Sequence, residues 1–408
     1  MLIRPDRRYP FYIMIGPIAS LLLADLVFYF HKMGDVFWDF RTIYTAVKAQ
    51  GQGLNPYDLA ALQSVDPGVI FPFIYPPNAL WILKPLSYVP YDFAAVADAM
   101  VTILALIAIY IGYGALCRIR PCRLLYLGAF ALGLSAASIS AFASGNIAVI
   151  LHGVIALGLL AWMRGRTAPF YLAVLVASQF KPFFITFLIL PCLLDWRRNW
   201  RGIAVSAGIF GGEYLALRAA DPIDFGRFLT VAQTIYSPGS GNYGDGFAGV
   251  VMDLLGHFQK ATGIDLPNAI GYGCYAVFAF IVIMASWKIS IRAQGSSRSD
   301  SGVRALLVVS TLLCLPRLKD YDLPVLIVPL LVLAENIIMR WQNSLSATLI
   351  LALLFMFPGG MRLGNIVADA VVTYWSFFAI FLVWCLACFA LSQVSPIEES
   401  GTGGLERK

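Results

Sequence analysis

The sequence has little charge and little histidine. Only 13% of its 408 residues are charged and three are histidine, whereas 59% are hydrophobic. A soluble domain of this size carries about twice that share of charged residues, so a water-soluble globular fold is excluded. The net charge of +6 comes without any lysine and arginine cluster interleaved with aromatic residues. This absence argues against nucleic acid as a partner.

The seven cysteines give no sign of a disulfide framework or a metal site. They lie in or beside apolar segments, and no two of them form a plausible pair in a long external loop. Cys385 and Cys388 share a helix face, but no further Cys or His lies near enough to complete a site. His31, His152 and His257 are scattered along the chain. We therefore expect neither a bound metal nor another cofactor.

Long apolar runs recur along most of the chain, and the mean hydropathy is +0.76. This pattern predicts an all-α polytopic membrane protein. Placing the separating arginine and lysine clusters on the cytoplasmic side gives about twelve transmembrane helices with both termini cytoplasmic. The expected spans and half-spans are Tyr9–Phe30, Tyr91–Ala115, Leu124–Ser144, Ile147–Met163, Pro169–Phe180, Phe183–Leu194, Gly202–Ala220, Ile270–Ile291, Ala305–Pro316, Leu323–Met339, Ala347–Pro358 and Val367–Ser392.

The chain is expected to form one membrane domain over residues 1–394. Residues 395–408 predict a disordered cytoplasmic tail. Two external loops are long, residues 31–90 and residues 221–268. Within the first, the apolar stretch 79–83 is too short to span and predicts a surface or re-entrant helix.

The segment DFRTIYTAVKAQ follows the first expected span. Phe40, Ile43, Tyr44 and Val47 recur at helical spacing and predict an amphipathic helix on the outer membrane surface. Asp39 comes directly before this apolar stripe, which is an N-cap position. From the segment alone, Asp39 is either a helix cap or a catalytic residue.

These residues resemble a known enzyme family. An Asp after the first span, followed by Tyr, Gly, Tyr-Asp and Tyr-Pro-Pro, resembles the GT-C polyprenyl-phosphate-sugar glycosyltransferases, in particular family 87, which includes phosphatidylinositol-mannoside mannosyltransferases. Gly145-Asn146 and Lys181-Pro182 are similar to later motifs of that family. The segment from Pro316 to Asp322 also resembles the family, but Leu315 replaces a Ser and Tyr321 stands where a His is common. The first set of matching positions is Asp39, Tyr44, Gly53, Tyr57, Tyr75, Pro76 and Pro77.

The resemblance implies a GT-C fold and an inverting transfer of a hexose, with mannose as the expected sugar. The donor would be a polyprenyl-phosphate sugar, and the acceptor a lipid or glycan hydroxyl on the periplasmic side of the inner (plasma) membrane. Such a transfer needs one carboxylate to take the hydroxyl proton. A lipid phosphate leaves without protonation, so no acid is needed. We assign the general base to Asp39, with Asp35 as runner-up.

The leaving phosphate requires cations where the dielectric constant is low. Lys181, Arg317 and Lys319 are expected at outer helix ends, and we predict that they bind this phosphate. The alternatives are a snorkelling lysine at position 181 and a surface charge cluster around positions 317–322. The weaker candidates for contacts with the donor or its sugar are Tyr75, Asn146, Asp320 and Tyr321.

Two other functions stay open at this point. A secondary transporter often has about twelve spans, but no clear repeat relates the two halves of this chain. A polysaccharide ligase or polymerase would use the loop 221–268, where His257, Arg227 and Lys260 are few for holding a diphosphate. The partners expected for the glycosyltransferase are the lipid-linked donor, the acceptor and membrane lipids.

Overall fold

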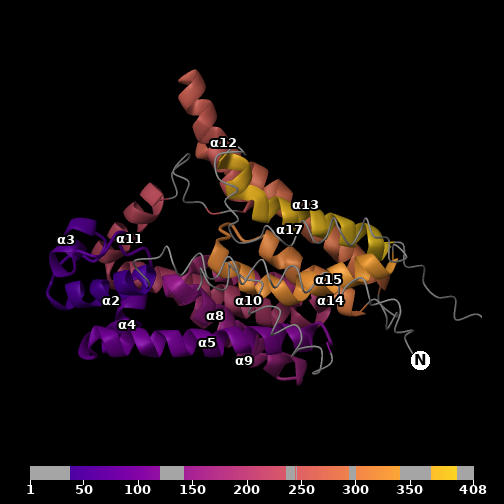
Figure 1. Ribbon diagram of the computed structural model, residues 1–408, viewed down its shortest axis with the longest axis horizontal. Helices are drawn as coiled ribbons and strands as arrows, with labels where there is room; N and C mark the ends of the chain where they lie inside the picture. The colour runs from indigo at the N-terminus through magenta and orange to yellow at the C-terminus, as the bar shows by residue number, and fades with distance from the viewer. Residues whose placement is uncertain are drawn as a thin grey trace, which may run out of the picture.

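The computed structural model describes residues 37–119, 142–235, 244, 246–293, 300–340 and 369–392. Within these ranges the regular structure is entirely helical (Figure 1). Tyr91–Leu116, Asn268–Arg292 and Tyr321–Ile338 are long and apolar enough to cross a membrane. The prediction of an all-α polytopic membrane protein is thus confirmed. The expected count of spans stays a prediction, because Tyr9–Phe30, most of Leu124–Ser144, Ala347–Pro358 and the tail 395–408 lie outside the described residues.

The first long loop forms a group of short helices at one end of the molecule (Figure 1). The predicted amphipathic helix is α2 (Trp38–Gly51), and its predicted apolar stripe is buried. The predicted short helix is α4 (Pro77–Leu83), which continues into the 3-10 helix η2 (Lys84–Tyr88). A third helix, α3 (Leu59–Val65), lies between these two in the sequence.

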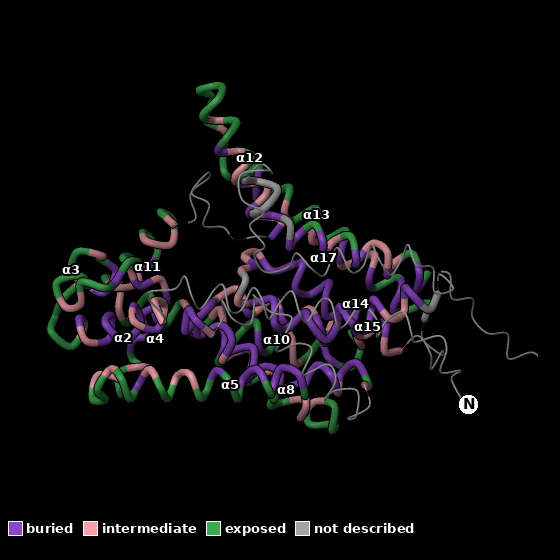
Figure 2. Tube along the Cα trace, in the orientation of Figure 1, coloured by how far each residue is buried: buried purple, intermediate pink, exposed green. Residues whose placement is uncertain are grey.

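Of the described part of the chain, three helices form the bundle next to this group: α5 (Tyr91–Leu116), α8 (Ile147–Met163) and α9 (Ala168–Phe180). α5 and α8 run parallel and close together. A Cβ added at Gly153 would lie 2.6 Å from the Ala105 side chain, so the glycine permits this approach. The outward face of α5 carries exposed apolar side chains, as a lipid-facing helix would (Figure 2).

The segment after α9 differs from the sequence-based expectation. The 3-10 helix η3 (Pro182–Leu188) leads directly into α10 (Ile189–Ala220). The expected half-span Phe183–Leu194 is thus divided between η3 and the start of α10, and the next expected span, Gly202–Ala220, lies wholly in α10. The change of direction falls at Asp195, whose φ of −160° and ψ of 88° are not helical. The second long loop also contains two helices, α11 (Pro222–Ile235) and α12 (Phe247–Thr262), and α12 projects from the body (Figure 1).

In the C-terminal half, five further elements lie within the described residues and complete the helical body. They are α13 (Asn268–Ala293), α14 (Asp300–Leu313), the 3-10 helix η4 (Asp320–Leu326), α15 (Ile327–Arg340) and α17 (Asp369–Ser392). η4 and α15 pack against α5, and η4 also packs against α8. This packing brings the segment after residue 316 to the end of the bundle where α8 begins and α9 ends.

Candidate active site

Asp39 lies in the first turn of α2 and does not cap it. Phe37 occupies the N-cap position in a left-handed conformation, with φ of 65°, and makes no side-chain capping bond. The backbone N–H of Phe37 donates to the Ala143 carbonyl at 2.6 Å. The Asp39 carboxylate instead accepts a hydrogen bond from Asn146 Nδ2 at 2.7 Å. The capping interpretation of Asp39 is therefore wrong, because the neighbouring connection before α8 fixes the start of α2.

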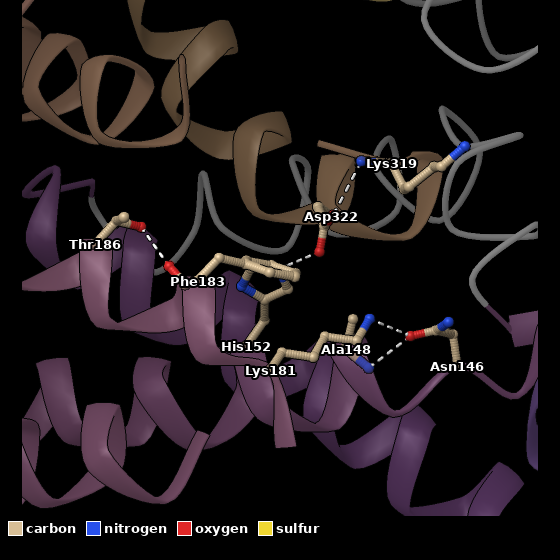
Figure 3. A network of polar contacts seen from close by, with 8 residues as sticks. All are labelled: Asn146, Ala148, His152, Lys181, Phe183, Thr186, Lys319 and Asp322. Atoms are coloured by element: carbon tan, nitrogen blue, oxygen red, sulfur yellow. Dashed lines mark hydrogen bonds and ion pairs between the residues drawn. The ribbon is translucent and has the colours of Figure 1, made fainter. Parts of the chain in front are cut away.

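Asn146 connects the first helix group with the bundle. It is the N-cap of α8, where its Oδ1 accepts from the Ala148 backbone N–H at 2.9 Å. The same oxygen accepts from Lys181 Nζ at 2.8 Å (Figure 3). Gly145 precedes it with φ of +60°, and a Cβ there would lie 2.8 Å from Phe37 and from Phe40. Only glycine combines this conformation with so close an approach of α2.

Lys181 is a buried cation, with 3% of its surface exposed. It follows the end of α9, and Pro182 after it prevents the helix from continuing. Its Nζ lies 4.3 Å from the centroid of the Tyr321 ring and 6.0 Å from that of Tyr75. Burial lowers the pKa of the Lys181 ammonium to about 7, although the charges of Asp322 and Asp39 oppose this shift.

η4 places a second polar pair beside Lys181. Asp322 Oδ1 lies 3.0 Å from His152 Nε2, and both side chains are fully buried. The other carboxylate oxygen of Asp322 accepts from the Lys319 backbone N–H at 3.0 Å. The Lys319 side chain points away from Asp322 in Figure 3. His152 is therefore paired with a carboxylate inside the helix bundle.

An apolar cavity of about 260 Å³ opens beside these cations. Lys181 and Arg317 are the charged side chains in its wall, and the other wall residues are aromatic or apolar. This combination suits an amphipathic ligand with an anionic group. The lining residues are Ile74, Tyr75, Phe180, Lys181, Pro182, Phe183, Phe228, Ala232, Tyr272, Pro316 and Arg317.

Comparison with known proteins identifies the family to which the chain belongs. The model of glycosyltransferase family 87 matches residues 73–316, more than half of the chain. The chain belongs to glycosyltransferase family 87. An alpha-(1->3)-arabinofuranosyltransferase of Corynebacterium glutamicum is 28% identical over 188 residues, which are 45% of this chain and 43% of that protein. The match thus spans less than half of that relative. No solved structure matches the chain.

The family match covers only part of the site. Tyr75, Asn146 and Lys181 lie inside the matched residues of family 87, whereas Asp39 and Lys319 lie outside them. The family 87 match therefore gives no information about Asp39, and only the contacts of its carboxylate indicate what it can do.

The Asp39 carboxyl has an environment that suits a base. Burial raises its pKa above the ordinary value of 3.8. The hydrogen bond from Asn146 and the charges of Lys181, Arg317 and Lys319 act in the opposite direction and are smaller. The Asp39 carboxylate therefore binds a proton more tightly than an exposed aspartate does, even though three cations act on it.

The structure brings together most of the residues that the sequence singled out. Lys181, Arg317 and Lys319, from two connections far apart in the chain, all act electrostatically on Asp39. The Asp320 side chain and Asp35 lie outside the described part of the chain. Asn146, expected to touch the donor, hydrogen-bonds to Asp39, Ala148 and Lys181.

Sequence reasoning did not predict that His152 pairs with Asp322 beside Lys181. Aromatic rings enclose His152, with the Phe184 centroid 4.7 Å from that of the imidazole. One signal was present in the sequence: His152 lies six residues after Asn146, in an otherwise apolar helix. An ionisable residue inside a membrane helix is a functional candidate by default.

Proposed function

We propose that this family 87 glycosyltransferase moves a hexose, with mannose as the first candidate, from a polyprenyl-phosphate sugar to a lipid or glycan hydroxyl. The observation that carries the proposal is the hydrogen-bonded chain from Asp39 through Asn146 to Lys181 at the edge of the apolar cavity. In this series of hydrogen bonds, Asp39 provides a base and Lys181 provides a cation for the donor phosphate.

The proposed transfer requires little more than the Asp39 base and the Lys181 cation. The acceptor oxygen attacks the anomeric carbon, the bond from that carbon to the phosphate oxygen breaks, and the hydroxyl proton passes to the Asp39 carboxylate. The configuration is inverted, because attack is opposite to the leaving group. The lipid phosphate leaves with the bonding electrons, and Lys181 and Arg317 stabilise its charge. No acid and no metal ion are needed for this step.

The apolar wall of the cavity supports a lipid-linked donor rather than a water-soluble sugar nucleotide. Its volume accommodates the first part of an isoprenoid chain, and the exposed apolar faces of the surrounding helices continue toward the lipid. A phosphodiester bound there has its single negative charge next to Lys181 and Arg317.

We place this site on the extracytoplasmic side of the inner (plasma) membrane, in a chain of about twelve spans. Arg118, Asp300 and Arg304 form ion pairs at the opposite end of the same helices. Arg304 Nη1 also donates to Met163 Sδ at 3.7 Å, beside the basic connection between α8 and α9. A basic end that faces the cytoplasm leaves Asp39 and Lys181 at the outer face.

An arabinofuranosyl group is the second candidate sugar. The observation in its favour is the name of the Corynebacterium glutamicum relative. Membership of family 87 favours a glycosyltransferase over a secondary transporter, while a polymerase that repeats the same transfer differs only in its acceptor.

The test is a donor screen with purified protein in lipid nanodiscs. Polyprenyl-phosphate mannose, glucose and arabinofuranose are offered separately, with lipid and oligosaccharide acceptors, and products are detected by mass spectrometry. We expect transfer from a polyprenyl-phosphate sugar and release of the lipid phosphate. Transfer only from a nucleotide sugar, or movement of an unaltered sugar across the bilayer without transfer, would overturn the proposal.

A further inference from the structure

One side chain joins the proposed base and the proposed phosphate cation. Asn146 is 4% exposed. Its Nδ2 donates to Asp39 Oδ2 at 2.7 Å, and its Oδ1 accepts from Lys181 Nζ at 2.8 Å. The Oδ1 also accepts from the Ala148 backbone N–H, so both of its lone pairs are used.

These partners allow the amide only one orientation. If the amide were reversed, its NH₂ group would face the Lys181 ammonium and the Ala148 N–H, which are both donors. Its oxygen would then face the Asp39 carboxylate, which is an acceptor. Each contact would be repulsive, so the three partners together lock the side chain.

We propose that Asn146 is a positioning residue that fixes the distance between the general base and the phosphate cation. The inference rests on the proposed function, since it assigns those two roles to Asp39 and Lys181. It also replaces the earlier expectation that Asn146 binds the donor. An acceptor hydroxyl held by Asp39 and a phosphate held by Lys181 are then placed for attack at one anomeric carbon.

The arrangement can persist while substrate binds. The Lys181 ammonium has three N–H donors, so it keeps its bond to Asn146 and still offers donors to a phosphate. Its charge polarises the amide and strengthens the bond from Nδ2 to the carboxylate. A displacement of about 1 Å between reacting groups lowers rates by about 10²-fold. Asn146 therefore influences turnover without touching the reacting atoms.

The experiment replaces Asn146 with a residue that caps but does not bridge. Serine is as good an N-cap as asparagine, yet it is too short to contact both Asp39 and Lys181. For Asn146→Ser we expect kcat to fall by about 10- to 100-fold and the affinity for lipid phosphate to fall more weakly. Asp58 is the N-cap of α3, where it accepts from the Ala60 N–H at 3.1 Å. Asp58→Ser is the matched control, and its kcat should not change.

Two double-mutant cycles distinguish positioning from a general loss of structure. In an Asp39→Asn background, Asn146→Ser should cause little further loss of kcat, because the residue acts through Asp39. In a Lys181→Ala background, it should cause little further loss of lipid-phosphate affinity. A merely structural role predicts that the effects multiply in both cycles, and that result would overturn the proposal.

The pH profile is an independent readout. The Asn146 hydrogen bond holds the pKa of Asp39 down, so its removal should move the acid limb of kcat/KM to higher pH. Lys181, Arg317 and Lys319 also act on Asp39 and stay in place in this variant. Asn146→Asp keeps the length and the cap but adds a negative charge, so it should move the limb further in the same direction.

The outcomes separate this inference from the proposed function. If the unaltered protein transfers sugar and Asn146→Ser matches it in kcat and acid limb, the positioning role alone is wrong. If the unaltered protein transfers no sugar from any polyprenyl-phosphate donor, the proposed function fails. The Lys181 cycle, measured by binding of polyprenyl phosphate alone, then decides whether Asn146 still orients that cation. Absence of this binding would overturn both.

Discussion

The two ends of the helix bundle both carry charge, but they hold it differently. At the end where α8 begins, Lys181 is 3% exposed, and the His152 and Asp322 side chains are fully buried. At the other end, the ion pairs of Asp300 involve an Arg118 side chain that is 57% exposed and an Arg304 side chain that is 18% exposed.

This difference indicates which charges do chemistry. An ion pair in water contributes little, and basic residues at a cytoplasmic membrane face need only to stay solvated. A buried charge costs several kcal/mol in desolvation, and membrane proteins retain such charges where function requires them. The burial of these charges therefore supports placing the proposed site at this end of the bundle, rather than at the end where the charges are more exposed.

The largest effect is expected from Asp39→Asn at the buried end. The variant keeps the size of the side chain and an acceptor for Asn146, but it cannot take the acceptor proton. We expect kcat to fall by about 10²- to 10⁴-fold while the affinity for lipid phosphate stays within a few-fold. Turnover is measured by mass spectrometry and binding by titration in nanodiscs. The matched control is Asp58→Asn at the exposed cap of α3. An active Asp39→Asn enzyme would remove Asp39 from the mechanism.

The buried pair beneath the site should control stability. His152→Leu leaves the Asp322 carboxylate buried without its ring partner, and breaking a buried pair typically costs about 3–5 kcal/mol of unfolding free energy. We expect a clearly lower midpoint of thermal unfolding in detergent. The double variant His152→Leu with Asp322→Asn should regain part of the loss, because the uncompensated charge is gone. A single variant as stable as the unaltered protein would contradict this account.

Lys181 should act on binding more than on turnover. Removing a charged hydrogen-bond donor is worth about 1.5–3 kcal/mol, so Lys181→Ala should weaken lipid-phosphate binding by about 10- to 100-fold. Lys48→Ala, in the last turn of α2, is the control and should bind normally. Equal affinity in Lys181→Ala and the unaltered protein would exclude Lys181 from the phosphate site.

The pKa of Lys181 predicts how the affinity for lipid phosphate changes with pH. Because burial lowers that pKa to about 7, the ammonium is charged below this pH and loses its proton above it. Affinity for the phosphodiester donor should therefore fall from about pH 6 to about pH 9. Lys181→Arg keeps its charge throughout this range, so its binding should be nearly flat. A flat profile in the unaltered protein would contradict the assignment.

The smallest effect is expected at the exposed end. Arg304→Gln removes the ion pair with Asp300, and partly exposed pairs contribute about 0–1 kcal/mol. We expect unchanged kcat, unchanged lipid-phosphate binding and a thermal midpoint within a few degrees of the unaltered protein. A loss of transfer comparable to that of Asp39→Asn would show that the two ends are not functionally distinct.

Much of the helix pattern was predictable because it depends on local sequence. The predicted Ile147–Met163 is found with the same limits as α8, and the predicted Tyr91–Ala115 is one residue shorter than α5. The ends of such helices depend on the length of the apolar run and on the proline or charged residues that flank it. The expected boundary between Phe183–Leu194 and Gly202–Ala220 is present as the kink at Asp195, but the second helix begins earlier than expected because helical backbone resumes directly after that residue.

The sequence by itself determined that the chain is a helical membrane protein, and that Asp39, Lys181, Arg317 and Lys319 are unusual charges at helix ends. Hydrophobicity and charge are properties of individual residues, so they can be seen without a fold. Only the tertiary structure decided that Asp39 is not a cap and that Asn146 bonds to both Asp39 and Lys181. Those contacts join residues 107 and 35 positions apart. They exist because three connections pack at one end of the bundle, where desolvated polar groups must find partners in each other.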